Sequence, residues 1–99
     1  MRVRKVRGIA RDTLRFILEA SRSSQPMEFA GLLQVDEEII TEVLILPGTE
    51  NSRMSALVRL YMLPNMAVAG SVHSHPSGQL RPSEPDLIFF SRTGDYHII

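Results

Sequence analysis

The sequence predicts an α+β domain in which a mostly antiparallel β-sheet is flanked by two helices. Three observations predict it: a stretch with helical spacing near the start, several apolar runs bounded by turn residues in the middle, and a second helical stretch near the end. A length of 99 residues, with 43% apolar and 22% charged, is ordinary for one small globular domain. We therefore expect a single domain over residues 1–99.

The first helix is predicted to begin at Asp12, whose side chain suits an N-cap. The residues that recur at helical spacing on one face are Leu14, Ile17, Leu18 and Ser21. The segment 21–26, rich in serine and closed by a proline, is a suitable end.

The strands are predicted from runs rich in branched residues. The expected ranges are 28–35, 39–46, 55–61, 66–72 and 96–99. The first two are separated only by an acidic turn at 36–38, so we expect them to form a hairpin. The fourth ends directly before His73, and on a strand His73 and His75 would project from the same face.

The second helix is predicted over residues 83–92, after a loop that its prolines and Gly78 keep irregular. Leu87 and Phe90, with Ile88, are expected to point inward, and Gly94 is a suitable stop.

Charge and composition exclude several classes of protein. Eleven basic and eleven acidic side chains cancel, so neither nucleic acid nor an anionic membrane is expected as a partner. Residues 1–7 form a basic N-terminal extension, which suits a solvated terminus more than a nucleic-acid-binding arm. Cysteine is absent, which rules out disulfides and thiolate ligands. No apolar run suits a signal peptide or a membrane span, so we expect a cytoplasmic protein.

The residues best suited to chemistry lie between 73 and 86. His73, His75 and Asp86 make a set of three zinc ligands that leaves the fourth tetrahedral position to water. A zinc-bound water has a pKa of about 7, and a nearby base would complete a hydrolytic site. Glu28, a carboxylate at the start of an apolar run, is the candidate.

Ser83 and Asp86 have a second interpretation as a helix start. A serine at the N-cap followed three residues later by an acid is a capping signature. Because Pro85 has no N–H, a capping Ser83 would accept from the N–H of Asp86, and its own hydroxyl hydrogen would stay available. Ser83 can therefore cap the helix and still take part in the chemistry of the site.

These residues resemble the signature of the JAMM or MPN-domain zinc metalloproteases. The signature is a distant Glu, then His-x-His, seven residues, Ser, two residues and Asp, which Glu28, His73, His75, Ser83 and Asp86 match at every spacing. The resemblance covers about residues 8–99 and implies a curved sheet of the cytidine-deaminase-like MPN/JAB fold.

The resemblance also implies roles. His73, His75 and Asp86 would bind one Zn²⁺ per chain with a water as fourth ligand, Glu28 would be general base and then general acid, and Ser83 would stabilise the oxyanion. The reaction would be hydrolysis of an isopeptide or peptide bond after the tail of a ubiquitin-like protein.

Three alternatives remain: a peptidase that trims a sulfur-carrier protein of ubiquitin fold, a scaffold MPN domain with weak or no activity, and a nucleic-acid-binding protein. Members of the resembled family usually continue past the strand 96–99, so the resemblance implies that this chain is short at its C-terminus, and we expect either a homodimer through that strand or reduced stability.

Overall fold

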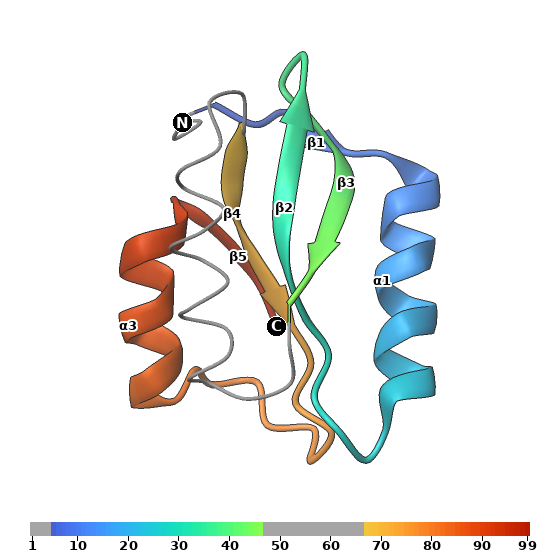
Figure 1. Cartoon of the computed structure of the whole chain (residues 1–99), viewed down its shortest axis with the longest axis vertical. Helices are drawn as coiled ribbons and strands as arrows, with labels where there is room; N and C mark the ends of the chain where they lie inside the picture. The colour runs from blue at the N-terminus through green and yellow to red at the C-terminus, as the bar shows by residue number, and fades with distance from the viewer. Residues whose placement is uncertain (1–4, 47–66) are drawn as a thin grey trace.

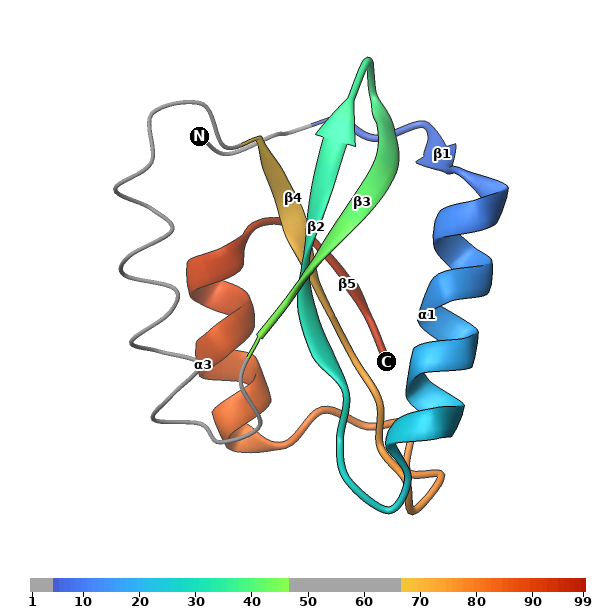
Figure 2. The same ribbon diagram turned by 45° about the vertical axis from the view of Figure 1, so that its right-hand side comes forward.

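The computed structural model describes residues 5–46 and 67–99, which form a twisted sheet with one helix on each side (Figure 1). The elements are β1 (Gly8–Ile9), α1 (Arg11–Ser24), β2 (Ala30–Asp36), β3 (Ile39–Ile45), β4 (Val68–His73), α3 (Glu84–Thr93) and β5 (Tyr96–Ile98). The strand predicted at 55–61 lies outside the described residues. Both views place α1 and α3 on opposite sides of the sheet (Figure 2).

Within residues 5–46 and 67–99, the sheet has five strands in the order β1-β3-β2-β4-β5. The two central pairs, β2 with β3 and β2 with β4, are antiparallel, and the two outer pairs are parallel. The sheet is therefore mixed, and the predicted α+β class with two flanking helices is confirmed.

The hairpin predicted from the acidic turn is confirmed. Glu37 and Glu38 both have positive φ, at 49° and 68°. Two successive residues of this kind form the turn whose twist matches that of the flanking strands. The turn joins β2 to β3 without an intervening loop.

The N-cap of helix α1 lies two residues earlier than predicted and makes no side-chain cap hydrogen bond. Ala10 is its N-cap, so the prediction of Asp12 in that role is wrong; Asp12 instead lies in the first turn, where its charge complements the helix dipole. The buried residues of α1 are Thr13 and Ile17, whereas Leu14 and Leu18 are 40% and 59% exposed. The helix is thus rotated relative to the predicted face, and the Thr13 hydroxyl donates to the carbonyl of Thr41 at 2.7 Å.

The two faces of β2 belong to different hydrophobic clusters. Phe29 and Leu33 pack with Ile17 on the α1 side, while Ala30 and Leu32 pack against Phe89 on the α3 side. Leu32 and Leu33 have no exposed surface, and burial of each contributes about 1.5–3 kcal/mol. This alternation also decides which neighbouring side chains face α3.

Helix α3 begins at the predicted N-cap, Ser83, and has Gly94 as its C-cap. Phe89 and Phe90 are half-buried, but Leu87 and Ile88 are 53% and 56% exposed, so the inward prediction is wrong for both. Asp86 and Phe90 are one helical turn apart and face the sheet together, which places Leu87 and Ile88 further round the helix.

Strand β5 approaches β4 closely at Gly70. A Cβ on Gly70 would collide with the backbone of Tyr96. Only glycine fits this approach, so the β4–β5 pairing depends on it.

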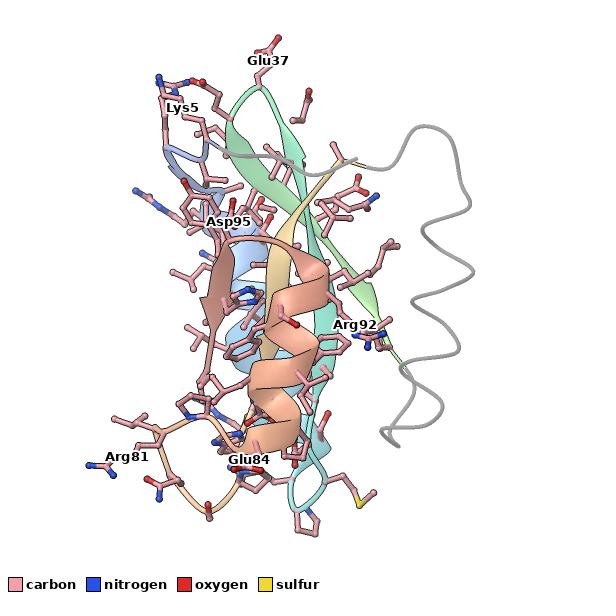
Figure 3. All side chains as sticks on the ribbon, turned by 90° about the vertical axis from the view of Figure 1, so that its left-hand side faces the viewer. Lys5, Glu37, Arg81, Glu84, Arg92 and Asp95 are labelled. Carbon is pink, nitrogen blue, oxygen red and sulfur yellow. The ribbon has the colours of Figure 1, made fainter. Side chains whose placement is uncertain are left out.

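The described part of the basic N-terminal segment lies at the end of the molecule opposite the start of α3. Lys5 and Arg7 lie 3.7 and 3.0 Å from the Glu38 carboxylate, and Figure 3 shows Lys5 and Glu37 at one end and Arg81 and Glu84 at the other.

Among residues 5–46 and 67–99, no helix has the length and apolar character needed to cross a bilayer.

Candidate metal site

The site forms where β2 begins and β4 ends. Antiparallel register pairs Ala30 with His73, and one step further the main-chain N–H of Ser74 donates to the carbonyl of Phe29 at 2.8 Å. The same alternation brings Glu28 opposite His75. Both views place the loops before β2 and after β4 side by side, close to the start of α3 (Figures 1 and 2).

Three donor atoms converge in this place. Nε2 of His73 and Nε2 of His75 are 2.9 Å apart, and Oδ2 of Asp86 lies 3.2 Å from the first and 3.1 Å from the second. His73 is the last residue of β4, one residue beyond the end of the predicted strand 66–72, and is buried. His75 follows in the loop, so the two histidines are not both on the strand.

Glu28, which lies just before β2, completes the cluster. One of its carboxylate oxygens and one nitrogen of each of His73 and His75 all lie within 4.8 Å of one another. Glu28 is exposed, whereas His73 is buried and His75 is half-buried. The arrangement therefore has a buried side, made of imidazoles, and a solvent side, where the carboxylate of Glu28 lies.

A hydrogen bond outside the cluster defines the state of His75. Its Nδ1 lies 2.7 Å from the carbonyl oxygen of Gln79. A carbonyl only accepts, so we place a hydrogen on Nδ1, and the tautomer with this hydrogen has its lone pair at Nε2. Gly78 makes this possible: its φ of 82° closes a turn in which its N–H donates to the carbonyl of His75 at 2.9 Å.

Asp86 is held by the reciprocal capping box at the start of α3. The N–H of Ser83 donates to Oδ2 of Asp86 at 2.8 Å, and the N–H of Asp86 donates to Oγ of Ser83 at 3.2 Å. The predicted cap is confirmed, and it orients the same carboxylate oxygen that contacts both histidines. Ser83 itself is exposed beside the cluster.

The protonation states suit a cation. Burial lowers the pKa of His73 below 6.5, although the Asp86 carboxylate opposes this. Burial acts to raise the pKa of Asp86, but hydrogen bonding with Ser83 and the charge of His73 outweigh it, and the pKa lies below 3.8. Near neutral pH the cluster therefore has a neutral His73 and an ionised Asp86.

The donor set fits a small divalent ion. Bonds of about 2.0–2.1 Å in a tetrahedral arrangement separate neighbouring ligand atoms by roughly 3.3 Å, and the three observed separations are 2.9, 3.1 and 3.2 Å. Two imidazole nitrogens and one carboxylate oxygen would thus hold the ion after movements of a few tenths of an ångström.

The cluster opens on two hollows. One, of about 390 Å³, runs from His73 and His75 to the apolar side chains of Leu14, Leu18 and Leu80. The other, of about 360 Å³, lies beside Glu28 and is lined by Pro26, Met27, Glu28, His75, Pro76 and Ser77. There is therefore open space on both sides of the candidate ligands.

Sequence reasoning missed two residues that surround the cluster. Ser74 binds the main chain next to Glu28, and His97 contacts Phe90, which in turn contacts His73. A hydroxyl between two candidate ligands, and the last of only three histidines, were the available signals. Neither signal indicates which strand the side chain would contact.

Comparison with known proteins identifies a family and a relative that agree with each other. Residues 10–99 match the family of prokaryotic homologs of the JAB domain. A protein of Haloferax volcanii named probable metalloprotease is 46% identical over 99% of this chain and 67% of its own length.

Solved structures agree with the family match. A JAB1/MPN domain protein from Archaeoglobus fulgidus is 39% identical, with a TM-score of 0.72 over 94% of this chain and 77% of that one. A structure presented as JAMM, a metalloprotease-like zinc site in the proteasome and signalosome, is 38% identical, with a TM-score of 0.69 over 96% and 76%. With a matching sequence family, fold and convergent histidines and acids, this chain belongs to the prokaryotic JAB family, within the JAB1/MPN group.

Proposed function

We propose that this protein is a zinc metallopeptidase that hydrolyses the isopeptide or peptide bond after the C-terminal tail of a ubiquitin-like protein. The observation that carries the proposal is the convergence of Nε2 of His73, Nε2 of His75 and Oδ2 of Asp86, with the carboxylate of Glu28 beside them. A relative named as a probable metalloprotease and a relative described by its zinc site support it.

Zinc suits these ligands because it accepts imidazole and carboxylate donors in a tetrahedral site. His73, His75 and Asp86 would hold it. When bound, zinc would supply Lewis acidity and a water that ionises near neutral pH.

Glu28 is assigned the proton transfers. Its carboxylate would accept a proton from the attacking water, whose oxygen bonds to the carbonyl carbon, and would return that proton to the nitrogen as the C–N bond breaks. The same residue thus acts as base and then as acid. Its exposed position on the solvent side of the histidines gives it access to water.

Ser83 is assigned to the carbonyl oxygen. While Oγ accepts from the Asp86 N–H, the hydroxyl hydrogen would donate to the oxygen on which negative charge develops. His75 and Asp86 are fixed by Gln79 and Ser83, so the groups need little reorganisation during the reaction.

A ubiquitin-like substrate is supported by the resemblance and by the shape of the site. The two hollows flank the histidines and are open to solvent. An extended tail can reach such a site while the folded body of the substrate stays outside.

The test is a cleavage assay on ubiquitin-like proteins joined either to a lysine side chain or to a linear extension. Zinc-loaded protein should cleave, chelation should stop cleavage, and Glu28→Gln should retain zinc while losing activity by at least about 100-fold. Glu37→Gln, a matched change at the opposite end of the molecule (Figure 3), should cleave normally.

The outcomes separate the alternatives. Cleavage of linear extensions alone would select a peptidase that trims a ubiquitin-fold carrier protein. Zinc binding with no cleavage of either substrate would favour a scaffold domain, and cleavage that survives complete chelation would refute the mechanism.

A further inference from the structure

Three aromatic rings from three elements, one of them that of the candidate ligand His73, are linked by two contacts. The ring of Phe90 is stacked on that of His97, with centroids 4.1 Å apart and planes at 14°. The centroid of Phe90 is also 5.7 Å from that of His73, with planes tilted by 46°. Phe90 therefore contacts both a candidate ligand and a histidine that is not one.

Both nitrogens of His97 already have protein partners. Nε2 lies 2.9 Å from the carbonyl oxygen of Gly94, and Nδ1 lies 2.8 Å from Oγ of Ser71. Since the carbonyl only accepts, we assign the hydrogen to Nε2, and the Ser71 hydroxyl then donates to Nδ1. His97 is thus held by hydrogen bonds at both ring nitrogens, so neither nitrogen is available to a metal.

The residues that anchor His97 are buried. Ser71 is fully buried in β4 and is the register partner of His97 in β5. Gly94 ends α3 and is buried. The orientation of the His97 ring is therefore set by the sheet on one side and by the helix end on the other.

Phe90 transmits this orientation to the site. Asp86 and Phe90 are four residues apart on α3, so they project from the same helix face. Among the described residues, the other aromatic side chain of this helix, Phe89, packs instead with the Leu32 cluster. The stack on His97 thus restrains the helix rotation that determines where the Asp86 carboxylate meets His73.

We propose that His97 and Phe90 are positioning residues, which hold α3 against β4 so that the Asp86 carboxylate stays within reach of both His73 and His75. This inference rests on the proposed metal site. The geometric part of it, however, concerns only the chain's own residues and can be tested without metal.

The experiment compares Phe90→Leu with the matched control Phe89→Leu, which makes the same change on the same helix away from the histidines. Zinc affinity is measured by competition with a chromophoric chelator, the geometry of bound Co²⁺ by its visible absorption, and stability by thermal unfolding of the metal-free chain. Phe90→Leu should weaken zinc binding by roughly 10–100-fold, as changes outside the ligand shell do, and should alter the Co²⁺ spectrum. Phe89→Leu should leave affinity and spectrum unchanged even where it lowers the melting temperature.

Ser71→Ala provides a second variant, because it removes only the hydroxyl that fixes His97. It should weaken zinc binding by roughly two- to tenfold, the worth of one hydrogen bond. Wild-type affinity in both Phe90→Leu and Ser71→Ala would overturn the inference, and so would equal losses in Phe89→Leu and Phe90→Leu that follow their melting temperatures.

A metal-free measurement separates this inference from the proposed function. Nuclear Overhauser contacts between the Asp86 β-protons and the His75 ring should be present in the wild type and in Phe89→Leu, and lost in Phe90→Leu. If the wild-type chain takes up no zinc, the proposed function fails, and these contacts alone decide the inference: their persistence in Phe90→Leu would overturn it.

Discussion

The hydroxyl of Ser74 accepts a hydrogen bond from the main-chain N–H of Phe29 at 2.8 Å, while the N–H of Ser74 donates to the Phe29 carbonyl at 2.8 Å. The side chain thus takes the part that a backbone carbonyl has in a regular antiparallel pair. The bonds lie between the last ladder pair, Ala30 with His73, and the facing residues Glu28 and His75. They fix the spacing of the candidate base from the candidate ligands.

Ser74→Ala should therefore reduce activity through Glu28. The N–H of Phe29 loses its partner, which costs about 1–3 kcal/mol when the group remains buried, and the chain before β2 is free to move away. We expect kcat to fall by roughly tenfold or more, since small displacements of catalytic groups have effects of this order, while the zinc content stays complete. Steady-state kinetics and metal analysis measure the two effects.

Ser74→Thr is the control for this prediction because it retains the hydroxyl. It should restore most of the lost rate. A threonine variant as slow as the alanine variant would show that the volume of the side chain, and not its hydrogen bond, matters.

The double role of Ser83 can be separated by two substitutions. Ser83→Ala removes both the hydroxyl and the cap, which costs about 0.5–2 kcal/mol, whereas glycine at an N-cap costs only a few tenths. If the hydroxyl acts on the carbonyl oxygen, Ser83→Ala and Ser83→Gly should lose kcat to a similar extent while only the alanine variant loses stability. Chemical unfolding and kinetics on both variants give the answer; a glycine variant with normal kcat would reduce Ser83 to a cap.

Acid should destabilise the metal-free chain in two steps. The folded pKa of His73 is below 6.5, so the unfolded chain binds more protons as the pH falls below that value, and the free energy of unfolding decreases. The folded pKa of Asp86 is below 3.8, so its contribution is present above 3.8 and is lost as the pH falls through the folded value. Urea unfolding between pH 7.5 and 3 should show both steps.

His73→Gln provides the control for the first step. This variant should lose the decrease that begins below pH 6.5 and keep the one at lower pH. Stability that increases on acidification between pH 7 and 5 would contradict the prediction.

Zinc should raise the melting temperature. At a free concentration 100 times the dissociation constant, a ligand that binds only the folded chain adds about 2.7 kcal/mol, or roughly 10–20 °C for a domain of this size. Calorimetry with and without zinc measures the shift. His75→Gln should abolish most of it, and an equal shift in that variant would place the metal elsewhere.

Much of the fold could be predicted from the sequence because local signals and tertiary packing agree. The acidic turn between two branched runs predicted the β2–β3 hairpin, and the Ser83, Pro85 and Asp86 pattern predicted the start of α3. The face of α1 was predicted less well. Leu14 and Leu18 satisfy the helical period as Thr13 and Ile17 do, and only the position of the sheet decides which pair is buried.

In the candidate site, too, some features follow from the local sequence and others depend on the tertiary structure. The spacing of His73, His75, Ser83 and Asp86 is local, so the sequence predicted their proximity. The meeting of Glu28 with His75, and the roles of Ser74 and His97, depend on strand register and on the β4–β5 pairing. These are non-local relationships that no short motif encodes.

The register of β2 against β4 therefore specifies more than the sheet. On one side of this ladder are Phe29 and Val72, which belong to the α1 core, and on the other are Ala30 and the candidate ligand His73. A single residue inserted within β4 would exchange the two sides, sending the imidazole toward α1 and an apolar side chain toward Asp86. In related proteins, changes in length are therefore expected in the connections between elements, and the ladder itself is expected to have a constant length.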